Sequence, residues 1–177
     1  MIYGERVRLR AIEREDLPRF VAWLNDEEVT QGLMHYLPLS MADEESWYEG
    51  MRQRPADQRP LMIEVRVGED WTPVGDCGFF NLDWRIRSAE VGIFIGEKSL
   101  WNQGYGTDAM RLLLRHGFET LNLNRIMLDV YDTNPRAVRS YEKAGFVHEG
   151  RKRQGMYKNG RYIDLLQMSV LREEWKG

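Results

Sequence analysis

The fold is decided by two adjoining stretches of the sequence, Glu90-Val91-Gly92-Ile93-Phe94-Ile95-Gly96 and Trp101-Asn102-Gln103-Gly104-Tyr105-Gly106-Thr107. Along the first stretch apolar side chains alternate, which predicts a strand with Glu90, Gly92 and Phe94 on one face. The second stretch delivers two glycines to the start of a long amphipathic pattern, which predicts a loop followed by a helix. Gly104 and Gly106 leave the backbone N–H groups at that helix start uncovered, and such groups suit a phosphate or pyrophosphate.

The composition describes an ordinary globular chain. With 177 residues, 42% of them hydrophobic, we expect a single domain over residues 1–177 with a real core. A net charge of -3 argues against a nucleic-acid partner. The single cysteine, Cys77, excludes an internal disulfide and a cysteine-based zinc cluster, and we expect it to be buried. No metal and no membrane partner is expected, and without a signal-peptide pattern the expected location is cytoplasmic.

Hydrophobic periodicity predicts the other elements on both sides of this centre. The predicted segments are strands near 6–10, 61–67, 73–82, 90–95, 124–131, 146–154 and 162–171, and helices near 17–24, 40–53, 105–121 and 134–144. A capping box at Ser40 and Asp43, and an Asn134-Pro135 start, mark two of the helices. The order β-α-α-β-β-β-α-β-α-β-β indicates an α/β domain with a mixed, mostly antiparallel sheet of about six or seven strands and about four helices.

Three known phosphate-binding motifs place a glycine-rich loop after a strand. A Walker A loop requires a Lys-Ser/Thr pair, which this loop lacks. The dinucleotide fingerprint requires three glycines in the first βα unit, whereas Gly104 and Gly106 stand alone in the middle of the chain. The remaining device is the coenzyme A pyrophosphate loop of acyltransferases.

The motifs at this spacing resemble the GNAT superfamily of acetyl-CoA-dependent N-acetyltransferases. The resemblance rests on 104–109, on 134–146 and on Val7-Arg8-Leu9-Arg10 with Glu15-Asp16-Leu17, and it covers nearly the whole chain. Within the superfamily the chain looks most like the branch of ribosomal-protein N-terminal and spermidine/spermine N-acetyltransferases. One position departs: the family's loop motif usually begins with Gln or Arg three residues before the first glycine, where this chain has Trp101. Gln103 offers a polar group nearby.

The resemblance implies where acetyl-CoA binds as co-substrate. The strand around Ile93 to Ile95 should diverge from the strand at 126–131 and hold the pantetheine arm by main-chain hydrogen bonds. Backbone amides of the glycine loop should hold the pyrophosphate. The implied coenzyme-binding residues are Ile93, Phe94, Ile95, Gln103, Gly104, Tyr105, Gly106, Thr107, Asn134, Ala137 and Tyr141.

The expected reaction is direct attack of a primary amine on the thioester within a ternary complex. The amine arrives as an ammonium ion and must lose a proton, and the departing thiolate must gain one. By resemblance Tyr141 is the general acid, although a tyrosine on the packed side of a helix also reads as a core residue. We expect Glu90, through a water, to act as the base; an ion-paired surface carboxylate is the alternative. His35 and Asp132 are weaker candidates.

The sequence does not identify the amine that accepts the acetyl group. Acidic clusters at 26–28 and 43–45 favour a cationic amine, such as a polyamine or a peptide N-terminus, although acidic residues near helix ends are usually solvated. The basic residues of segment 151–161 have a solvated hairpin as their simplest interpretation. A homodimer is possible. The competing hypothesis is a coenzyme A-binding module that senses or regulates and has little catalytic activity.

Overall fold

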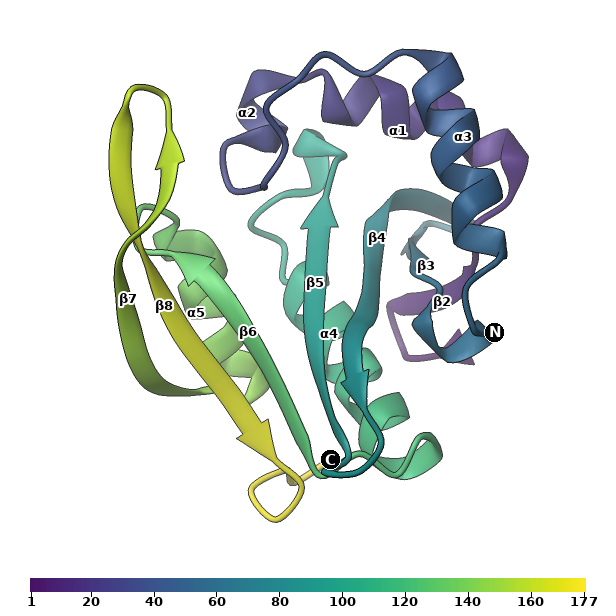
Figure 1. Cartoon of the computed structure of the whole chain (residues 1–177). Helices are drawn as coiled ribbons and strands as arrows, with labels where there is room; N and C mark the ends of the chain where they lie inside the picture. Colours follow the sequence, from purple (N-terminus) through teal and green to yellow (C-terminus); the bar gives the residue numbers. More distant parts are fainter.

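One mixed sheet organises the molecule. The computed structural model describes all 177 residues and contains eight strands in the order β1-β2-β3-β4-β5-β6-β8-β7. Five α-helices flank the sheet (Figure 1). The predicted fold class is confirmed; the strand count exceeds the prediction because the sequence pattern does not show the two-residue β1, Ile2–Tyr3, at the sheet edge. None of the helices combines the length and the apolar composition that crossing a membrane requires.

The N-terminal half supplies one edge of the sheet and three helices. Its elements are β2 (Val7–Ala11), α1 (Leu17–Leu24), α2 (Glu27–Thr30), α3 (Met41–Arg52), β3 (Leu61–Val67) and β4 (Asp70–Asp83). The predicted capping box begins α3, since the Ser40 hydroxyl accepts from the Asp43 N–H and the Asp43 carboxylate accepts from the Ser40 N–H. The short helix α2 overlaps the acidic end of the first predicted helix and the start of residues 29–39, for which the sequence indicates a loop or a short helical turn.

The C-terminal half builds the remainder of the sheet around two more helices. Its elements are β5 (Ser88–Ile95), α4 (Tyr105–Arg115), β6 (Arg125–Tyr131), α5 (Pro135–Ala144), β7 (Val147–Lys158) and β8 (Arg161–Leu171). Helix α4 continues into a π-helical segment, His116–Thr120. Strand β7 runs beyond its predicted end because the register shifts between Lys152 and Met156, which keeps the hairpin paired up to its tip.

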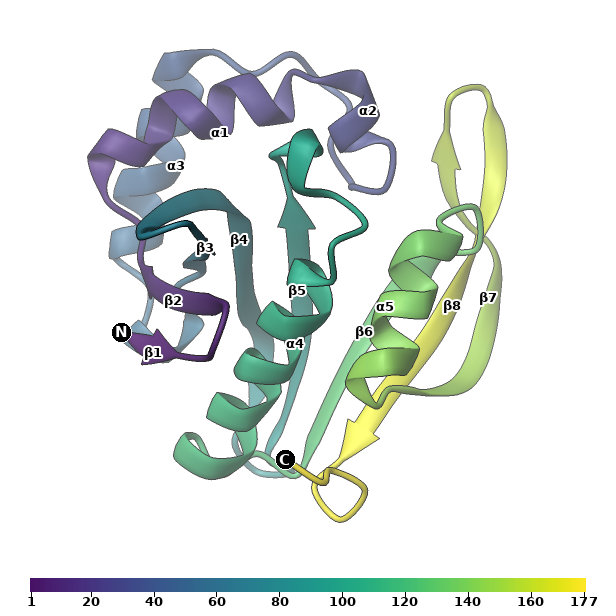
Figure 2. The ribbon, with the colours of Figure 1, turned by 180° about the vertical axis from the view of Figure 1, so that it is seen from behind.

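Alternating residues of the central strands enter two hydrophobic clusters on opposite faces of the sheet. Ile63 of β3 and Val91 of β5 pack beneath α4 in the larger cluster, which also buries Cys77 as expected. Met62 of β3 lies in a smaller cluster with residues of α1 and α3, and Phe94 of β5 packs against that cluster. Helices α4 and α5 cover one face, seen in front of the sheet in Figure 2.

Strands β5 and β6 form the only parallel pair of the sheet, and they separate early. Their register is limited to three pairs, from Ser88 with Arg125 to Glu90 with Met127. Beyond Glu90 the edge of β5 no longer pairs with β6, and Figure 1 shows the two strands diverging. Unpaired strand edges carry free N–H and C=O groups. The two strands therefore fork beyond Glu90 and are not paired with each other at residues 93–95, as the resemblance implied.

Candidate active site

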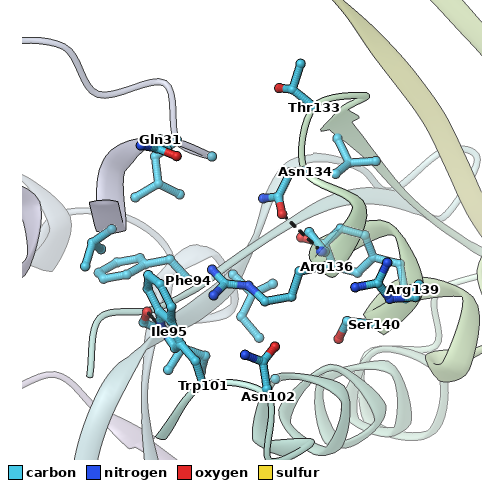
Figure 3. Close-up of a pocket in the computed structure, with 18 of the residues that line it drawn as sticks. Gln31, Phe94, Ile95, Trp101, Asn102, Thr133, Asn134, Arg136, Arg139 and Ser140 are labelled. Carbon is cyan, nitrogen blue, oxygen red and sulfur yellow. Dashed lines mark hydrogen bonds between the residues drawn. The ribbon is translucent and has the colours of Figure 1, made fainter. Parts of the chain in front are cut away.

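A cavity of about 660 Å³ occupies the fork between β5 and β6. Its walls come from α2 and the loop after it, the end of β5, the glycine loop with the first turn of α4, the end of β6, the N-terminal half of α5 and the tip of the β7–β8 hairpin. Figure 3 shows side chains from these elements directed into one space. The volume is in the range of sites for small organic ligands.

The glycine loop places a helix N-terminus at this cavity. Gly104 caps α4 with φ of 86°, a left-handed conformation that strains any residue with a side chain. The side chain of Arg6 fixes the loop from outside, because it donates to the backbone oxygen of Gln103 and to the carboxylate of Asp108. The hydroxyls of Thr107 and Ser140 lie 2.9 Å apart and join the first turn of α4 to α5.

Unpaired cationic side chains line the same cavity. Arg136, Arg139 and Lys143 follow helical spacing along α5 and face it, although no ion pair of theirs exists within the chain. Burial lowers the pKa of Arg136, and the nearby carboxylate of Glu28 partly opposes this effect. Three cations without ion-pair partners and a helix N-terminus fit a polyanion with phosphate groups. These three residues are not among the site residues expected from the sequence, although their spacing of three and four positions along a helix is a signal for them.

Trp101 stands where the resembled family has Gln or Arg, and it joins two walls of the cavity. Its indole N–H donates to the backbone oxygen of Ile95 at 2.7 Å, and its ring stacks with the guanidinium of Arg136 at 3.7 Å from the ring centre. Figure 3 shows the Arg136 side chain reaching across to Trp101. An arginine from α5 is therefore held beside the position at which the family motif places its own polar side chain.

Asn134 serves as the N-cap of α5. Its carboxamide oxygen accepts from the N–H of Ala137 at 3.1 Å, as drawn in Figure 3. The amide nitrogen points toward Gly32, since a Cβ at Gly32 would lie 2.5 Å from it. The loop after α2 thus closes against the start of α5, and only the nitrogen of Asn134 is left for a ligand.

Tyr141 faces the cavity from the second turn of α5 and makes no hydrogen bond within the chain. Its ring packs against Phe146, with ring centres 5.8 Å apart. Burial raises the pKa of Tyr141 to about 12, because the phenolate would lose its hydration. The phenol therefore stays protonated at neutral pH and has a proton to donate.

The structure brings most of the predicted site residues together. Those that line the cavity are Ile93, Phe94, Ile95, Gly104, Tyr105, Gly106, Thr107, Asn134, Ala137 and Tyr141. Gln103 is turned away, and its amide donates to the backbone oxygen of Ser99 at 3.0 Å.

The three residues considered as general base, Glu90, Asp132 and His35, do not line this cavity. Glu90 lies at the last paired position of the fork, four residues and therefore roughly 13 Å along the strand from Phe94. Glu90 lines neither of the two cavities described for this chain, and this position does not support it as the base. Asp132 forms an ion pair with Arg151 at 3.2 Å. His35 lines a second cavity of about 290 Å³ on the opposite side of Phe94.

A fork at the only parallel strand pair, with a cationic helix on one side and a glycine-capped helix on the other, is the arrangement expected of an acyltransferase that takes its acyl group from coenzyme A. The family model described as an acetyltransferase (GNAT) domain matches residues 6–147. The chain therefore belongs to the GNAT acetyltransferase family.

Similar proteins cover the full length of the chain. It is 32% identical to the putative ribosomal N-acetyltransferase YdaF of Bacillus subtilis, over 98% of this chain and 96% of that protein. It is 30% identical to the spermidine N(1)-acetyltransferase of Vibrio cholerae, over 97% and 96% of the two chains. The crystal structure of Vibrio cholerae spermidine N-acetyltransferase in complex with CoA and spermine superposes with a TM-score of 0.87 at 27% identity, over 97% and 98% of the two chains.

The chain is thus an acetyl-CoA-dependent N-acetyltransferase that acetylates an amine. Acetyl-CoA is its co-substrate, and no group of three or more potential metal ligands is present. The uncovered N-terminus of α4 and the unpaired cations of α5 fit the phosphate groups of this co-substrate. The open edge of β5 offers the main-chain groups that an extended arm requires.

Proposed function

We propose that this chain acetylates small polycationic amines of the polyamine type by direct attack on acetyl-CoA in the cavity at the β5–β6 fork. One observation carries the proposal: the phenol of Tyr141, the unpaired edge of β5 and the N-terminus of α4 converge on one cavity. The similarity to a spermidine acetyltransferase supports the polyamine as acceptor.

The roles follow from the environment of each group. Tyr141 acts as the general acid, because it carries a proton at neutral pH and faces the cavity without an internal partner. The same burial raises the proton affinity of a departing thiolate and thus favours the transfer. Main-chain N–H groups at Ile93 to Ile95 polarise the thioester carbonyl, and one such donor typically contributes about 3–4 kcal/mol.

A second candidate function is a coenzyme A-binding module with little catalysis. This alternative was considered because Trp101 replaces the usual polar residue of the loop. The stack between Trp101 and Arg136 places a cation at that part of the cavity, so this departure gives no reason to exclude turnover.

A thiol-release assay with acetyl-CoA tests the proposal. Spermidine, a peptide with a free N-terminus, an amino sugar and an aminoglycoside are compared as acceptors under identical conditions. We expect the highest kcat/KM with spermidine. Turnover only with the peptide would replace the acceptor class, and tight binding of coenzyme A with no turnover of any amine would favour the binding module.

A further inference from the structure

The amine of Lys158 lies in the wall of the cavity at the β5–β6 fork. Lys158 is at the tip of the β7–β8 hairpin and lines this cavity. Its ammonium donates to the backbone oxygens of Thr30, Leu33 and His35, and Leu33 lines the cavity as well. The amine is therefore held between the hairpin tip and the loop after α2, which together form one wall.

Lys158 also lies at the height of the fork where the thioester is expected. Its Nζ atom is 5.9 Å from the centre of the Tyr131 ring, and Tyr131 is the last residue of β6. Glu90 pairs with Met127 in the parallel register, and Phe94 and Tyr131 each lie four residues further along their strands. Because parallel strands rise equally per residue, Tyr131 flanks the fork at about the height of Phe94. The main chain around Phe94 is the part of β5 proposed above to polarise the thioester carbonyl.

The environment of Lys158 differs from that of the other lysines. The chain has five, Lys98, Lys143, Lys152, Lys158 and Lys176. Lys98 and Lys152 form ion pairs with carboxylates, and all except Lys158 are exposed. Lys158 makes no ion pair, and burial lowers its pKa. Only a neutral amine has an electron pair for attack, so Lys158 is the lysine most readily converted into a nucleophile.

We propose that Lys158 is a site of self-acetylation, at which the chain transfers the acetyl group of acetyl-CoA to its own side chain when no acceptor amine is bound. The inference rests on the proposed function, since it uses the same donor, the same cavity and the same general acid. It adds a second product to the reaction, a chain with an acetylated lysine at the hairpin tip.

The transfer needs no group beyond those already described. A neutral amine keeps two N–H donors, so the loop carbonyls hold Lys158 before and after it gives a proton to water. Its nitrogen then turns from the loop into the cavity, where the electron pair forms the C–N bond to the thioester carbon and the C–S bond breaks. Sulfur takes the phenolic proton of Tyr141, and the second proton on nitrogen restores the phenol.

Acetylation of Lys158 would loosen the wall that it now holds. The modified side chain has no charge and a single N–H, whereas three carbonyl oxygens accept from the ammonium group. The loop after α2 would lose most of these bonds and become mobile. The modified chain should therefore acetylate free amines less efficiently, which links its activity to the supply of acceptor.

The test incubates the protein with acetyl-CoA in the absence of amine. Mass spectrometry of the intact chain counts the acetyl groups, and peptide mapping locates them. Lys158→Arg keeps a cation for the loop carbonyls and cannot be acetylated in this way, while Lys176→Arg removes an exposed lysine outside both cavities and is the control. Tyr141→Phe tests whether the reaction uses the general acid of the enzyme.

We expect one acetyl group per chain, on Lys158, at a rate that is independent of protein concentration and suppressed by spermidine. Lys158→Arg should stay unmodified, and Lys176→Arg should react like the parent protein. Tyr141→Phe should slow the modification by about 10- to 10³-fold, as for loss of a general acid. Amide exchange of residues 30–36 should be at least about tenfold faster in the acetylated chain.

The possible results separate this inference from the proposed function. An unmodified Lys158 in a protein that turns over spermidine would overturn the inference and leave the proposed function intact. Equal modification rates in the parent protein and Tyr141→Phe would also overturn it, because they indicate uncatalysed reaction with acetyl-CoA. Acetylation of Lys158 that depends on Tyr141, with no turnover of any free amine, would support the inference and contradict the proposed acceptor. Acetyl transfer to neither would overturn both.

Discussion

The guanidinium carbon of Arg136 lies 3.7 Å from the centre of the Trp101 ring, while the indole N–H of Trp101 is bound to the backbone oxygen of Ile95. The two residues come from a loop and a helix on opposite sides of the cavity. Their stack holds a desolvated arginine charge in place and spans from the open strand to α5. Arg136 and Trp101 therefore act together, and changing either one should release the other.

Replacing Trp101 with Ala should raise the Kd for coenzyme A by about tenfold, because Arg136 would lose a cation–π contact of about 1–2 kcal/mol and swing free. Trp101→Phe keeps a ring for Arg136 but loses the bond to Ile95, so a smaller change is expected. Trp84→Ala, an exposed tryptophan outside the cavity, is the control. Equal coenzyme affinities for all of these proteins in calorimetry would show that the stack contributes nothing to binding.

Replacing Tyr141 with Phe should lower kcat by about 10- to 10³-fold and leave coenzyme affinity almost unchanged. Only the hydroxyl is removed, it makes no hydrogen bond within the chain, and the ring that packs on Phe146 is kept, so folding should be unaffected. Steady-state kinetics with saturating acetyl-CoA gives the measurement. A variant with the kcat of the parent protein would remove Tyr141 from the mechanism.

Gly104 and Gly145 offer a matched pair for the glycine loop, since both have left-handed backbone, with φ of 86° and 106°. Substitution of either by Ala strains the backbone by about 1 kcal/mol and should lower the melting temperature similarly. Only Gly104→Ala should also raise the Kd for coenzyme A, because its Cβ would lie 3.1 Å from the guanidinium of Arg6, which holds the loop at the cavity, whereas a Cβ at Gly145 would meet nothing within 4 Å. Equal coenzyme affinity in both variants would contradict the assignment of the loop to phosphate binding.

The sequence predicted the helices and strands well because the interactions that form them involve residues close together in the chain. The Asn134-Pro135 start of α5, the Ser40 capping box and the alternating strands all depend on residues within a few positions of one another. The fork at 93–95 followed from resemblance, since nothing in the strand pattern states where pairing ends.

The residues that meet at the site are far apart in the sequence, which explains why their contacts were not predicted. Asp76 of β4 and Glu44 of α3 line one cavity, and Arg136 of α5 stacks on Trp101 of the loop before α4, both through the packing of separate elements. Glu90 shares a face of β5 with Phe94 by strand alternation, but alternation does not tell how far along a strand a site lies. Tertiary packing decides which residues meet at the cavity, and it leaves Glu90 outside the lining.

Glu44 and Asp76 should make the stability of the protein depend on pH. Their pKa values in the folded state are raised to about 7 from ordinary values of 4.5 and 3.8, so the folded state binds more protons than the unfolded state between these limits. Their stabilising contribution is complete below about pH 4 and is lost as pH rises through 7. Thermal denaturation should therefore show Glu44→Gln gaining about 1–2 kcal/mol relative to the parent protein at pH 8 and less at pH 5.

A matched denaturation series isolates this effect from the other titrating groups. Glu49→Gln removes an exposed carboxyl of the same helix and should follow the parent protein at every pH. His35 faces the same cavity, so the series is repeated in a His35→Asn background as a second control. If Glu44→Gln and the parent protein lost stability in parallel between pH 5 and pH 8, the carboxyl of Glu44 would not be buried in solution.

Lys158, at the tip of the β7–β8 hairpin, holds the loop between α2 and α3. Its ammonium donates to the backbone oxygens of Thr30 and Leu33, each at 2.5 Å, and to that of His35 at 3.2 Å. Burial lowers the pKa of Lys158, yet three carbonyl oxygens accept from its ammonium group. This loop carries His35 into the second cavity and Gly32 against Asn134, so the hairpin tip controls one wall of each cavity.

Lys158→Met should free this loop without unfolding the sheet. Loss of hydrogen bonds to a charged group, each contributing about 1.5–3 kcal/mol, should speed amide exchange in residues 30–36 by at least about tenfold. The KM for the amine should rise with it, because His35 and its cavity wall would no longer be fixed. Arg153→Met, which removes an exposed cation of the same hairpin that makes no ion pair, is the control and should change neither quantity. Unaltered exchange in Lys158→Met would mean that the loop holds its position through α2 and Asn134 alone.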